Sequence, residues 1–536
     1  MKRRFRALVF AGAAAALMAL GAMTASAGDN SSGFHTAVPA MLTPLAPDSS
    51  VEPIISVGDT LDSGYMFESI PDGLSLTTNG RGTVDVYVNH ELSLVPFLGR
   101  VDFASSILSR VRLNQHSAGV LKGDYVIPAS ANYQRFCSNF LVGPRQGFER
   151  ELVLTNEEAR DIVLRNGVAW HPPAVSLAEP SAEQAGVVVA YDVKSREYRT
   201  IYGMGRHNHE NNVGVPGYGH PVVLSGDDTF DAPASQLYLY SASSGAALWN
   251  DQGKLYAFKS DDAAINDYGD LSGGASVSGR FIEVPRMIAT GKRADGRDVT
   301  SADFPGFPTP PTGIPDGPQW VLEVWSNQNN AFQFIRIEDI AYDRTSPNVV
   351  YFADTGEPRA IADPATGRLR RGQSGTLGPY PNGRIFKLVL DPRDPLAVTS
   401  LSILIDADSG PRPSPNVLHQ PDNIETTANS LLIQEDPGSH NAGAANGNAK
   451  IWRYDLTDGS LVKVAQVDQS LAPALQPGSW ESSGIVDASA AFGPGTFLVD
   501  VQAHGYEVLR IPSFQFPGIA SAREAGQLLL LELPGA

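Results

Sequence analysis

The fold is decided by a short apolar run that ends in an aromatic residue and an aspartate, Val187-Val188-Val189-Ala190-Tyr191-Asp192. Similar runs recur at Lys254–Phe258, Arg384–Leu388 and Lys450–Asp455, and insertions of different length separate them. β-Branched and aromatic residues bounded by Gly, Asn and Asp are typical of short strands. The sequence therefore predicts an all-β fold built from a loosely repeated unit of short strands.

Strand-like runs cover most of the remaining chain. The full set is Thr83–Asn89, Ser106–Asn114, Gly186–Asp192, Gln236–Ser241, Lys254–Phe258, Asn348–Asp354, Arg384–Leu390, Ser430–Gln434, Lys450–Asp455 and Thr496–Val501. Thr155–Val163 has helical character, and Phe304–Pro318 is so rich in Pro and Gly that we expect a long irregular loop. We favour a β-propeller, which can hold this many strands around one core, over a pair of β-sandwiches.

Composition and charge narrow the class of partner. The chain has 536 residues, of which 52 are Gly and 39 are Pro, and its net charge is −18. An acidic surface repels nucleic acid and anionic membranes, so we expect neither a nucleic-acid partner nor stable membrane insertion. The same charge suits a protein that collects cations before it meets an anionic substrate. Because Cys137 is the only cysteine, no intrachain disulfide can form.

The first residues are typical of an export signal. Basic residues precede an apolar run and a small-residue cleavage site, namely Lys2, Arg3, Arg4 and Arg6, then Ala7–Ala22, then Ala25-Ser26-Ala27. We expect cleavage after Ala27 and export to the periplasm or the medium, by the Sec or the twin-arginine route. The alternative is a signal anchor, for which the apolar run is short. Residues 28–50 are expected to form an N-terminal arm, and residues 51–536 a single β-propeller domain.

Acidic residues, often paired and often beside Asn or His, stand at the ends of predicted strands. They occur in Asn89-His90-Glu91, Asn156-Glu157-Glu158, Arg206–Asn211, Gly226-Asp227-Asp228, Arg336–Asp339, Gln420–Asn423 and Gln434-Glu435-Asp436. A propeller brings one strand end from every blade toward its central channel, so these residues can share one pocket. Oxygen ligands of this kind suit calcium and ferric iron. Each motif alone is also an ordinary turn or solvated loop, and only the set predicts a metal site.

Arg336 and Glu338 are two residues apart on a predicted strand and therefore share one face. A guanidinium and a metal-binding carboxylate placed in this way can address one bound phosphate. The sequence contains no Walker-type phosphate loop, nucleophile elbow, zincin helix motif or dinucleotide fingerprint. These absences favour metal-assisted hydrolysis.

Together these motifs resemble those of the PhoX-type alkaline phosphatases. The resemblance runs from Pro71-Asp72-Gly73-Leu74 to Gly526–Leu530 and so covers nearly the whole chain after the expected signal. It implies a six-bladed β-propeller with inserted loops and short helices. It also implies an exported enzyme that hydrolyses phosphomonoesters at a cluster of calcium and ferric ions.

The resemblance assigns roles to individual residues. It implies metal ligands at Glu91, Glu157, Asp192, Glu210, Asp228, Glu338 and Asp422, catalytic roles for Arg336 and Glu338, and substrate binding by Arg336 and His209. The family carries an iron-ligating cysteine where this chain has Asn156. Calcium is therefore the expected cofactor and iron is left open. Cys137 could replace that ligand if its loop folds inward, or it could be a buried structural thiol.

Three further points remain open at the level of sequence. Trp480–Asp487 and Asp500–His504 resemble a branch-specific feature that either adds calcium or substrate contacts or only closes the last blade. A calcium-dependent propeller hydrolase of the lactone or phosphotriester type is an alternative function. A non-catalytic secreted calcium-binding propeller is another. We expect a monomer that acts on a small phosphorylated substrate.

Overall fold

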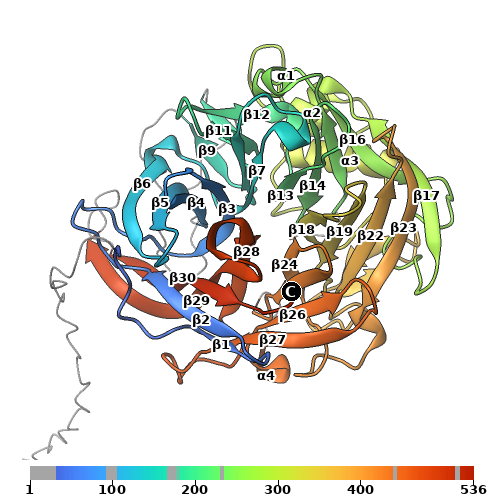
Figure 1. The fold of residues 1–536 in the computed structure, drawn as a ribbon. Coiled ribbons are helices and arrows are strands. Elements are labelled where there is room, and N and C mark those ends of the chain that lie inside the picture. Colours follow the sequence, from blue (N-terminus) through green and yellow to red (C-terminus); the bar gives the residue numbers. More distant parts are fainter. Residues whose placement is uncertain are drawn as a thin grey trace, which may run out of the picture.

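The computed structural model describes residues 32–91, 105–165, 177, 179, 181–229, 235–438, 443–512 and 520–536. This part of the chain is all-β, and its sheets stand around a central axis in a propeller-like arrangement (Figure 1). Every strand run expected from the sequence is a strand in the structure. The expected signal peptide, residues 1–27, lies outside the described residues.

Four sheets have four or five strands each. The first contains β3 (Pro71–Thr78), β4 (Thr83–His90), β5 (Ile107–Asn114) and β6 (Val120–Ile127), and the second contains β7 (Phe136–Val142), β8 (Leu152–Glu157), β11 (Val188–Asp192) and β12 (Tyr198–Ile201). The third contains β24 (Pro421–Thr426), β25 (Ser430–Glu435), β26 (Lys450–Asp455), β27 (Leu461–Val467) and β1 (Leu42–Pro44). The fourth contains β28 (Glu481–Asp487), β29 (Thr496–Pro512), β30 (Ala520–Glu532) and β2 (Ser50–Ser56).

A nine-stranded sheet completes the ring. Its order is β13 (His209–Gly214), β14 (Val222–Asp227), β15 (Tyr238–Ser241), β16 (Lys254–Ser260), β17 (Ser276–Glu283), β23 (Ala397–Asp406), β22 (Arg384–Leu390), β19 (Val349–Asp354) and β18 (Ile337–Tyr342). Its two end strands, β13 and β18, contact each other, so the sheet nearly closes on itself.

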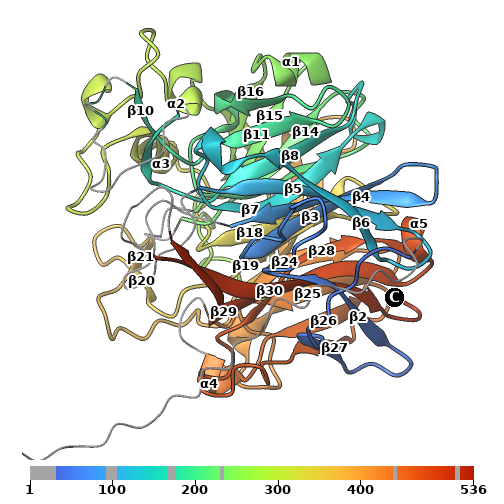
Figure 2. The ribbon, with the colours of Figure 1, turned by 90° about the vertical axis from the view of Figure 1, so that its left-hand side faces the viewer.

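The smaller elements lie in the connections. They are the strand pairs β9 (Ile162–Leu164) with β10 (Ala182–Gln184) and β20 (Ala360–Ala362) with β21 (Leu369–Arg371), and the helices α1 (Gly245–Trp249), α2 (Arg286–Thr290), α3 (Pro318–Gln328), α4 (Gly443–Asn446) and α5 (Ser489–Phe492). Several of them, including α2, α3, β10, β20 and β21, gather on one side of the ring (Figure 2). No helix in the described part of the chain is both long and apolar enough to cross a membrane.

The innermost strands form a closed ring. β3 contacts β7, β7 contacts β13, β13 contacts β18, β18 contacts β24, β24 contacts β28, and β28 contacts β3. The start of the chain helps to hold this ring, because β2 pairs with β30 near the end of the chain and β1 pairs with β27. The expected N-terminal arm, residues 28–50, thus contains the strand β1 and is tied to a sheet.

Two expectations about the connections had different outcomes. Thr155–Val163 is not helical, since β8 runs to Glu157 and β9 begins at Ile162. Thr155, Asn156 and Glu157 are fully buried and their backbone pairs with β11, so tertiary pairing overrides the local helical preference. The Pro- and Gly-rich segment after Asp303 is irregular up to α3, as expected.

Five inner strands share a local irregularity next to their first residue. The register of pairing shifts between Pro71 and Leu74, Phe136 and Asn139, His209 and Asn212, Ile337 and Ile340, and Pro421 and Ile424. A β-bulge of this kind removes residues from the regular ladder and redirects their side chains. The second residue of each of these strands therefore need not follow the alternation of an ordinary strand.

Gly73, inside the bulge of β3, offers a test of this close packing. A Cβ atom there would lie 2.3 Å from the Asn139 backbone nitrogen and 2.4 Å from the Ser138 Cα on β7. We expect Gly73→Ala to lower the free energy of unfolding by about 1–3 kcal/mol, because backbone atoms cannot move aside. Urea denaturation measures this, with Gly273→Ala as control, since nothing lies within 4 Å of that position. Equal stability of the two variants would contradict the interpretation.

Candidate metal centre

The bulged inner strands each present a ligand-type side chain from their second residue. These residues are Asp72 on β3, Cys137 on β7, Glu210 on β13, Glu338 on β18 and Asp422 on β24. A second set follows directly after the neighbouring strands, with Glu91 after β4 and Glu158 after β8. Four of the five sheets of the ring thus contribute from equivalent places, which explains why residues so far apart in sequence meet.

Seven of these side chains form one continuous cluster. Their ligand atoms lie within 4.8 Å of one another in three groups, Asp72 with Glu91 and Cys137, Cys137 with Glu158 and Glu210, and Glu210 with Glu338 and Asp422. Cys137 and Glu210 each belong to two groups and so link all three. We refer to these seven residues as the acidic centre.

Burial and mutual repulsion keep protons on the acidic centre when no cation compensates its charge. Burial, followed by neighbouring carboxylates, raises the pKa of Glu158, Glu210 and Asp422 well above the ordinary range. For Asp72, burial and the charge of Glu91 raise the pKa to about 7. Cations would relieve both the desolvation and the repulsion, so this electrostatic environment suits metal binding.

The chemistry of the donor set also fits metal ions. Six carboxylates offer hard oxygen ligands, which calcium and ferric iron favour, whereas the Cys137 thiol is a softer ligand that calcium does not favour. The Cys137 Sγ donates a hydrogen bond to Asp72 Oδ2 at 2.9 Å, and burial raises the pKa of this thiol. A metal ion bound at this corner would take the place of the thiol proton.

Two arginines flank the acidic centre at equivalent positions, each directly before an inner strand. Arg336 donates to Asp228 through Nε and Nη2, both at 2.5 Å, and its Nη2 lies 3.3 Å from Glu338 Oε1. Arg135 Nη1 lies 2.7 Å from Glu91 Oε1. Two guanidinium groups beside a cluster of carboxylates can bind an anion that also contacts the cations.

Several hydrogen bonds hold the carboxylates in place. The Thr355 hydroxyl donates to Glu338 Oε1 at 2.7 Å, and the Ser138 hydroxyl donates to Glu210 Oε1 at 2.8 Å. Asn423 Nδ2 in turn donates to the Ser138 hydroxyl at 2.9 Å. Glu210 and Glu338 are therefore each held by a neutral hydroxyl donor, which leaves their charge available for a cation.

The structure brings most of the predicted ligands together. Glu91, Glu210, Glu338 and Asp422 belong to the acidic centre. Asp228 lies at its edge, where its charge raises the pKa of Glu158 and Glu338 and its carboxylate is paired with Arg336.

Glu157 does not belong to the acidic centre. Its carboxylate receives two hydrogen bonds of 2.6 Å from Arg165 and further ones from the backbone N–H groups of Gln134 and Gly186. Glu157 therefore braces the surrounding loops, and its neighbour Glu158 faces the cluster instead. Adjacent residues at a strand end point to opposite sides, which the paired acids in the sequence do not reveal.

Asp192 and His209 are also placed away from the expected roles. Asp192 lies at the far end of β11, where it is paired with Arg150 at 2.6 Å and accepts hydrogen bonds from the turn that follows. The ring nitrogens of His209 are engaged by the Ser225 hydroxyl at 2.9 Å and the Gly205 carbonyl at 3.2 Å, so the buried imidazole has no nitrogen left for substrate.

Cys137 enters the acidic centre, which is one of the two possibilities that the sequence left open for this thiol. Asn156 does not contribute to the acidic centre, since its side-chain N–H groups donate to the backbone carbonyls of Ser138 and Glu210. Asp72, Glu158 and Arg135 also escaped the set of predicted site residues. Asp72 and Arg135 lie at or directly before the start of an inner strand, and Glu158 directly follows the end of β8.

A buried carboxylate on β29 lies near the acidic centre. Asp500 is fully buried, and neither of its oxygens has a hydrogen-bond partner in the described part of the chain. Burial, then the charges of Asp72 and Glu481, raises its pKa. A buried carboxylate without donors is costly unless it carries a proton or binds a cation. The expectation that Asp500–His504 adds calcium contacts thus has a structural basis in Asp500.

Neither a protein-family model nor a curated protein sequence matches the chain. Among solved structures, Pseudomonas fluorescens PhoX in complex with vanadate, a transition state analogue, aligns with 93% of this chain and 98% of that chain, at a TM-score of 0.56 and 18% identity. The fold is PhoX-like.

Other solved structures align less well. The GH93 α-L-arabinofuranosidase of Fusarium graminearum covers 89% of this chain and 97% of that chain at a TM-score of 0.33 and 11% identity. The hemagglutinin-neuraminidase ectodomain of parainfluenza virus 5 covers 91% and 86% at a TM-score of 0.32 and 11% identity. The PhoX-like fold is therefore the only one of these likenesses that bears on the present chain.

The different roles of Glu157 and Glu158 can be separated by matched variants. Glu157→Gln breaks a buried ion pair, so we expect the free energy of unfolding to fall by about 3–5 kcal/mol. Glu158→Gln removes a charge from a crowded cluster, so the metal-free protein keeps its stability while metal binding weakens. Denaturation in chelator and metal analysis after dialysis measure the two effects. The reverse pattern would show that the two glutamates have been assigned the wrong way round.

Proposed function

We propose that this protein is a metal-dependent hydrolase of phosphomonoesters with a six-bladed β-propeller of the PhoX type. One observation carries the proposal: seven ligand-type residues and two arginines converge at equivalent places of a PhoX-like fold. Phosphoryl transfer depends mainly on positioning and on neutralising the charge of the phosphoryl oxygens. A cationic cluster flanked by guanidinium groups meets both needs.

The count of six blades rests on the inner ring. The ring passes through β3, β7, β13, β18, β24 and β28, and each of these begins a run of antiparallel strands leading outward. The nine-stranded sheet then corresponds to two blades joined at their outer edges by the pairing of β17 with β23. In this interpretation the N-terminal strand β2 closes the last blade by pairing with β30.

The acidic centre would hold the metal ions. Its carboxylates suit calcium, and the corner formed by Asp72, Glu91 and Cys137 suits a softer ion such as iron. Bound cations of this kind supply positive charge to the phosphoryl oxygens and lower the pKa of bound water. The thiol of Cys137 restores the argument for iron that Asn156 had weakened.

The protein's own residues would position the substrate. Arg336 would bind the phosphate while Asp228 holds its guanidinium plane, and Arg135 would act from the opposite side of the acidic centre. Glu338 is oriented by the Thr355 hydroxyl and would act together with Arg336. In this proposal the main role of Asp228 is to orient Arg336, and direct binding of a metal ion is a lesser role.

The proposal includes export of the mature chain and a small phosphorylated substrate. It assumes a monomer without nucleic-acid partners or stable membrane insertion. The net charge of −18 supports the absence of nucleic-acid partners and of stable membrane insertion, and the basic, apolar N-terminus supports export.

Metal removal tests the proposed activity. The purified protein is stripped with chelator, reloaded with calcium alone or with calcium and iron, and assayed on a phosphomonoester, a phosphodiester and a lactone. We expect turnover of the phosphomonoester only after metal is restored, because the carboxylates cannot bind phosphate without cations. Turnover of the lactone alone would favour the calcium-dependent lactonase. No turnover with any metal would leave a non-catalytic cation-binding propeller.

Arg336 provides a sharper test. We expect Arg336→Ala to lower kcat/KM by about 100-fold or more, because a preorganised donor to the phosphoryl group is lost. Arg336→Lys keeps the charge without the bidentate geometry and should recover part of the activity. Arg280→Ala, at an exposed position on the outer strand β17, is the matched control. Metal content and melting temperature are recorded for each variant, and unchanged kcat/KM in both Arg336 variants would remove this residue from the site.

A further inference from the structure

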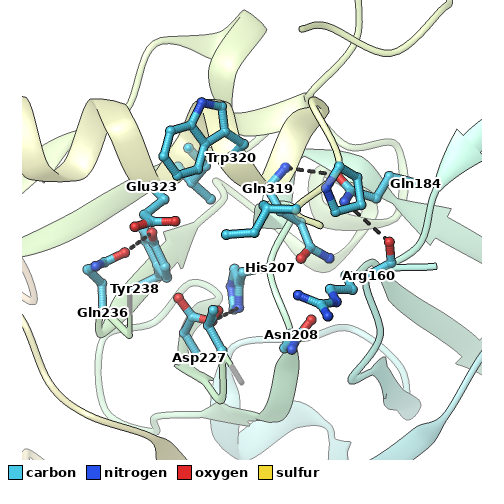
Figure 3. Close-up of a pocket in the computed structure, with 14 residues that line it drawn as sticks. Arg160, Gln184, His207, Asn208, Asp227, Gln236, Tyr238, Gln319, Trp320 and Glu323 are labelled. Carbon is cyan, nitrogen blue, oxygen red and sulfur yellow. Dashed lines mark hydrogen bonds and ion pairs between the residues drawn. The ribbon is translucent and has the colours of Figure 1, made fainter. Parts of the chain in front are cut away.

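A polar pocket lies beside α3, separate from the acidic centre (Figure 3). We call it the rim alcove and define it by His207, Asn208, Asp227, Gln236, Tyr238 and Glu323, which line it. Asp227 is the last residue of β14, His207 and Asn208 directly precede β13, and Glu323 comes from the helix that covers them (Figure 3).

Helix α3 is anchored firmly enough to act as the wall of a site. Gln319 Nε2 donates to the Ala159 carbonyl at 2.7 Å, and the Gln319 backbone N–H donates to Gln184 Oε1 at 3.1 Å. Trp320, which also lines the alcove, donates from Nε1 to the Pro308 carbonyl at 2.7 Å. Both the helix and the irregular loop before it are thus fixed to the propeller.

Three buried polar atoms in the alcove lack a hydrogen-bond partner in the described part of the chain. They are His207 Nδ1, Asn208 Oδ1 and Gln236 Nε2, on side chains that are 3%, 1% and 1% exposed. Unpaired polar atoms at this depth are costly, and a ligand that supplies the missing partners removes the cost.

The orientation of these side chains is determined by their other contacts. Asn208 donates from Nδ2 to the Asp228 carbonyl at 3.0 Å, which leaves Oδ1 free to accept. The His207 ring stacks on Tyr238, with ring centroids 4.8 Å apart, and its Nδ1 is 3.7 Å from Asp227 Oδ1, longer than a hydrogen bond. The alcove therefore presents Asn208 Oδ1 as an oriented acceptor beside the carboxylates of Asp227 and Glu323, while Gln236 Nε2 is a donor.

The charge of the alcove selects the sign of its ligand. Glu323 makes no hydrogen bond or ion pair with the described residues, and burial raises its pKa to about 8. Asp227 accepts a hydrogen bond of 2.6 Å from the Thr229 hydroxyl and faces no lysine. Arg160 also lines the alcove, where burial lowers its pKa and the charge of Asp161 opposes that shift. Burial raises the pKa of Asp227 as well, so both carboxylates hold a proton unless a cation compensates their charge. A bound ammonium group would favour the charged forms of both carboxylates, and a phosphate would disfavour them.

We propose that the rim alcove binds a small organic cation through a primary ammonium group. The ammonium N–H groups would donate to the Glu323 carboxylate, Asn208 Oδ1 and Asp227, while Trp320 and Tyr238 supply aromatic surface for the alkyl part. A bare metal ion fits less well, because His207, Asp227 and Glu323 are not among the groups of described residues whose ligand atoms lie within 4.8 Å of one another.

This site goes beyond the proposed hydrolase activity and does not depend on it. The alcove borders the edge of the acidic centre at Asp228, which follows Asp227 in the chain and pairs with the backbone and side chain of Asn208. Binding of an amine can therefore be measured whether or not the protein hydrolyses phosphomonoesters.

Calorimetric titration of the calcium-loaded full-length protein with propylammonium chloride tests the proposal. We expect saturable binding at one site, no binding of the neutral analogue propanol, and no heat from sodium chloride at the same concentration. Glu323→Gln removes one charge with little change of shape, so affinity should fall about tenfold or more. Glu283→Gln removes the same charge from an exposed position on β17 and should bind as the wild type does.

The outcomes separate clearly. Absence of saturable propylammonium binding, or equal binding of propanol, overturns the proposal from wild-type measurements alone, whatever the variant does. Undiminished binding to a folded Glu323→Gln variant places the ammonium group elsewhere and also overturns it. Binding that excess calcium abolishes in the wild type would place the amine in the acidic centre and would count against the alcove.

Discussion

Repulsion among buried carboxylates is the interaction on which the rest of this structure depends. Asp72, Glu91, Glu158, Glu210, Glu338 and Asp422 reach the centre from different sheets, so the ring can close only when protons or cations offset their charge. Arg135 and Arg336 neutralise part of that charge and leave the acidic centre in need of cations. Folding, metal binding and the proposed anionic substrate are therefore linked by one electrostatic requirement.

The β-bulges solve the geometric side of the same problem. Five inner strands bulge at their second residue, and that residue is a member of the acidic centre in every case. At the end of the neighbouring strand β8, the last residue, Glu157, accepts hydrogen bonds from backbone N–H groups. The next residue, Glu158, faces the acidic centre. The same β-bulge thus builds an asymmetric site, because the side chain at the bulge differs from strand to strand.

Sequence reasoning succeeded where the signal was local and failed where it required a partner strand. The runs at Arg384–Leu390 and Lys450–Asp455 are strands because their β-branched and aromatic residues favour a pleated, half-buried surface. Thr155–Val163 read as helical because the burial of Glu157 and Glu158 cannot be inferred from two adjacent charged residues. The role of Cys137 was left open because nothing local distinguishes an inward-facing thiol from a core thiol.

The sequence by itself determined the all-β class, the positions of most strands and four members of the acidic centre, Glu91, Glu210, Glu338 and Asp422. These properties depend on composition, alternation and short motifs, which act over a few residues. The tertiary structure decided that Glu158 replaces Glu157, that Cys137 enters the centre, and that residues 42–44 and 50–56 join sheets formed by the end of the chain. Such features depend on register and ring closure, which are determined by contacts between residues hundreds of positions apart.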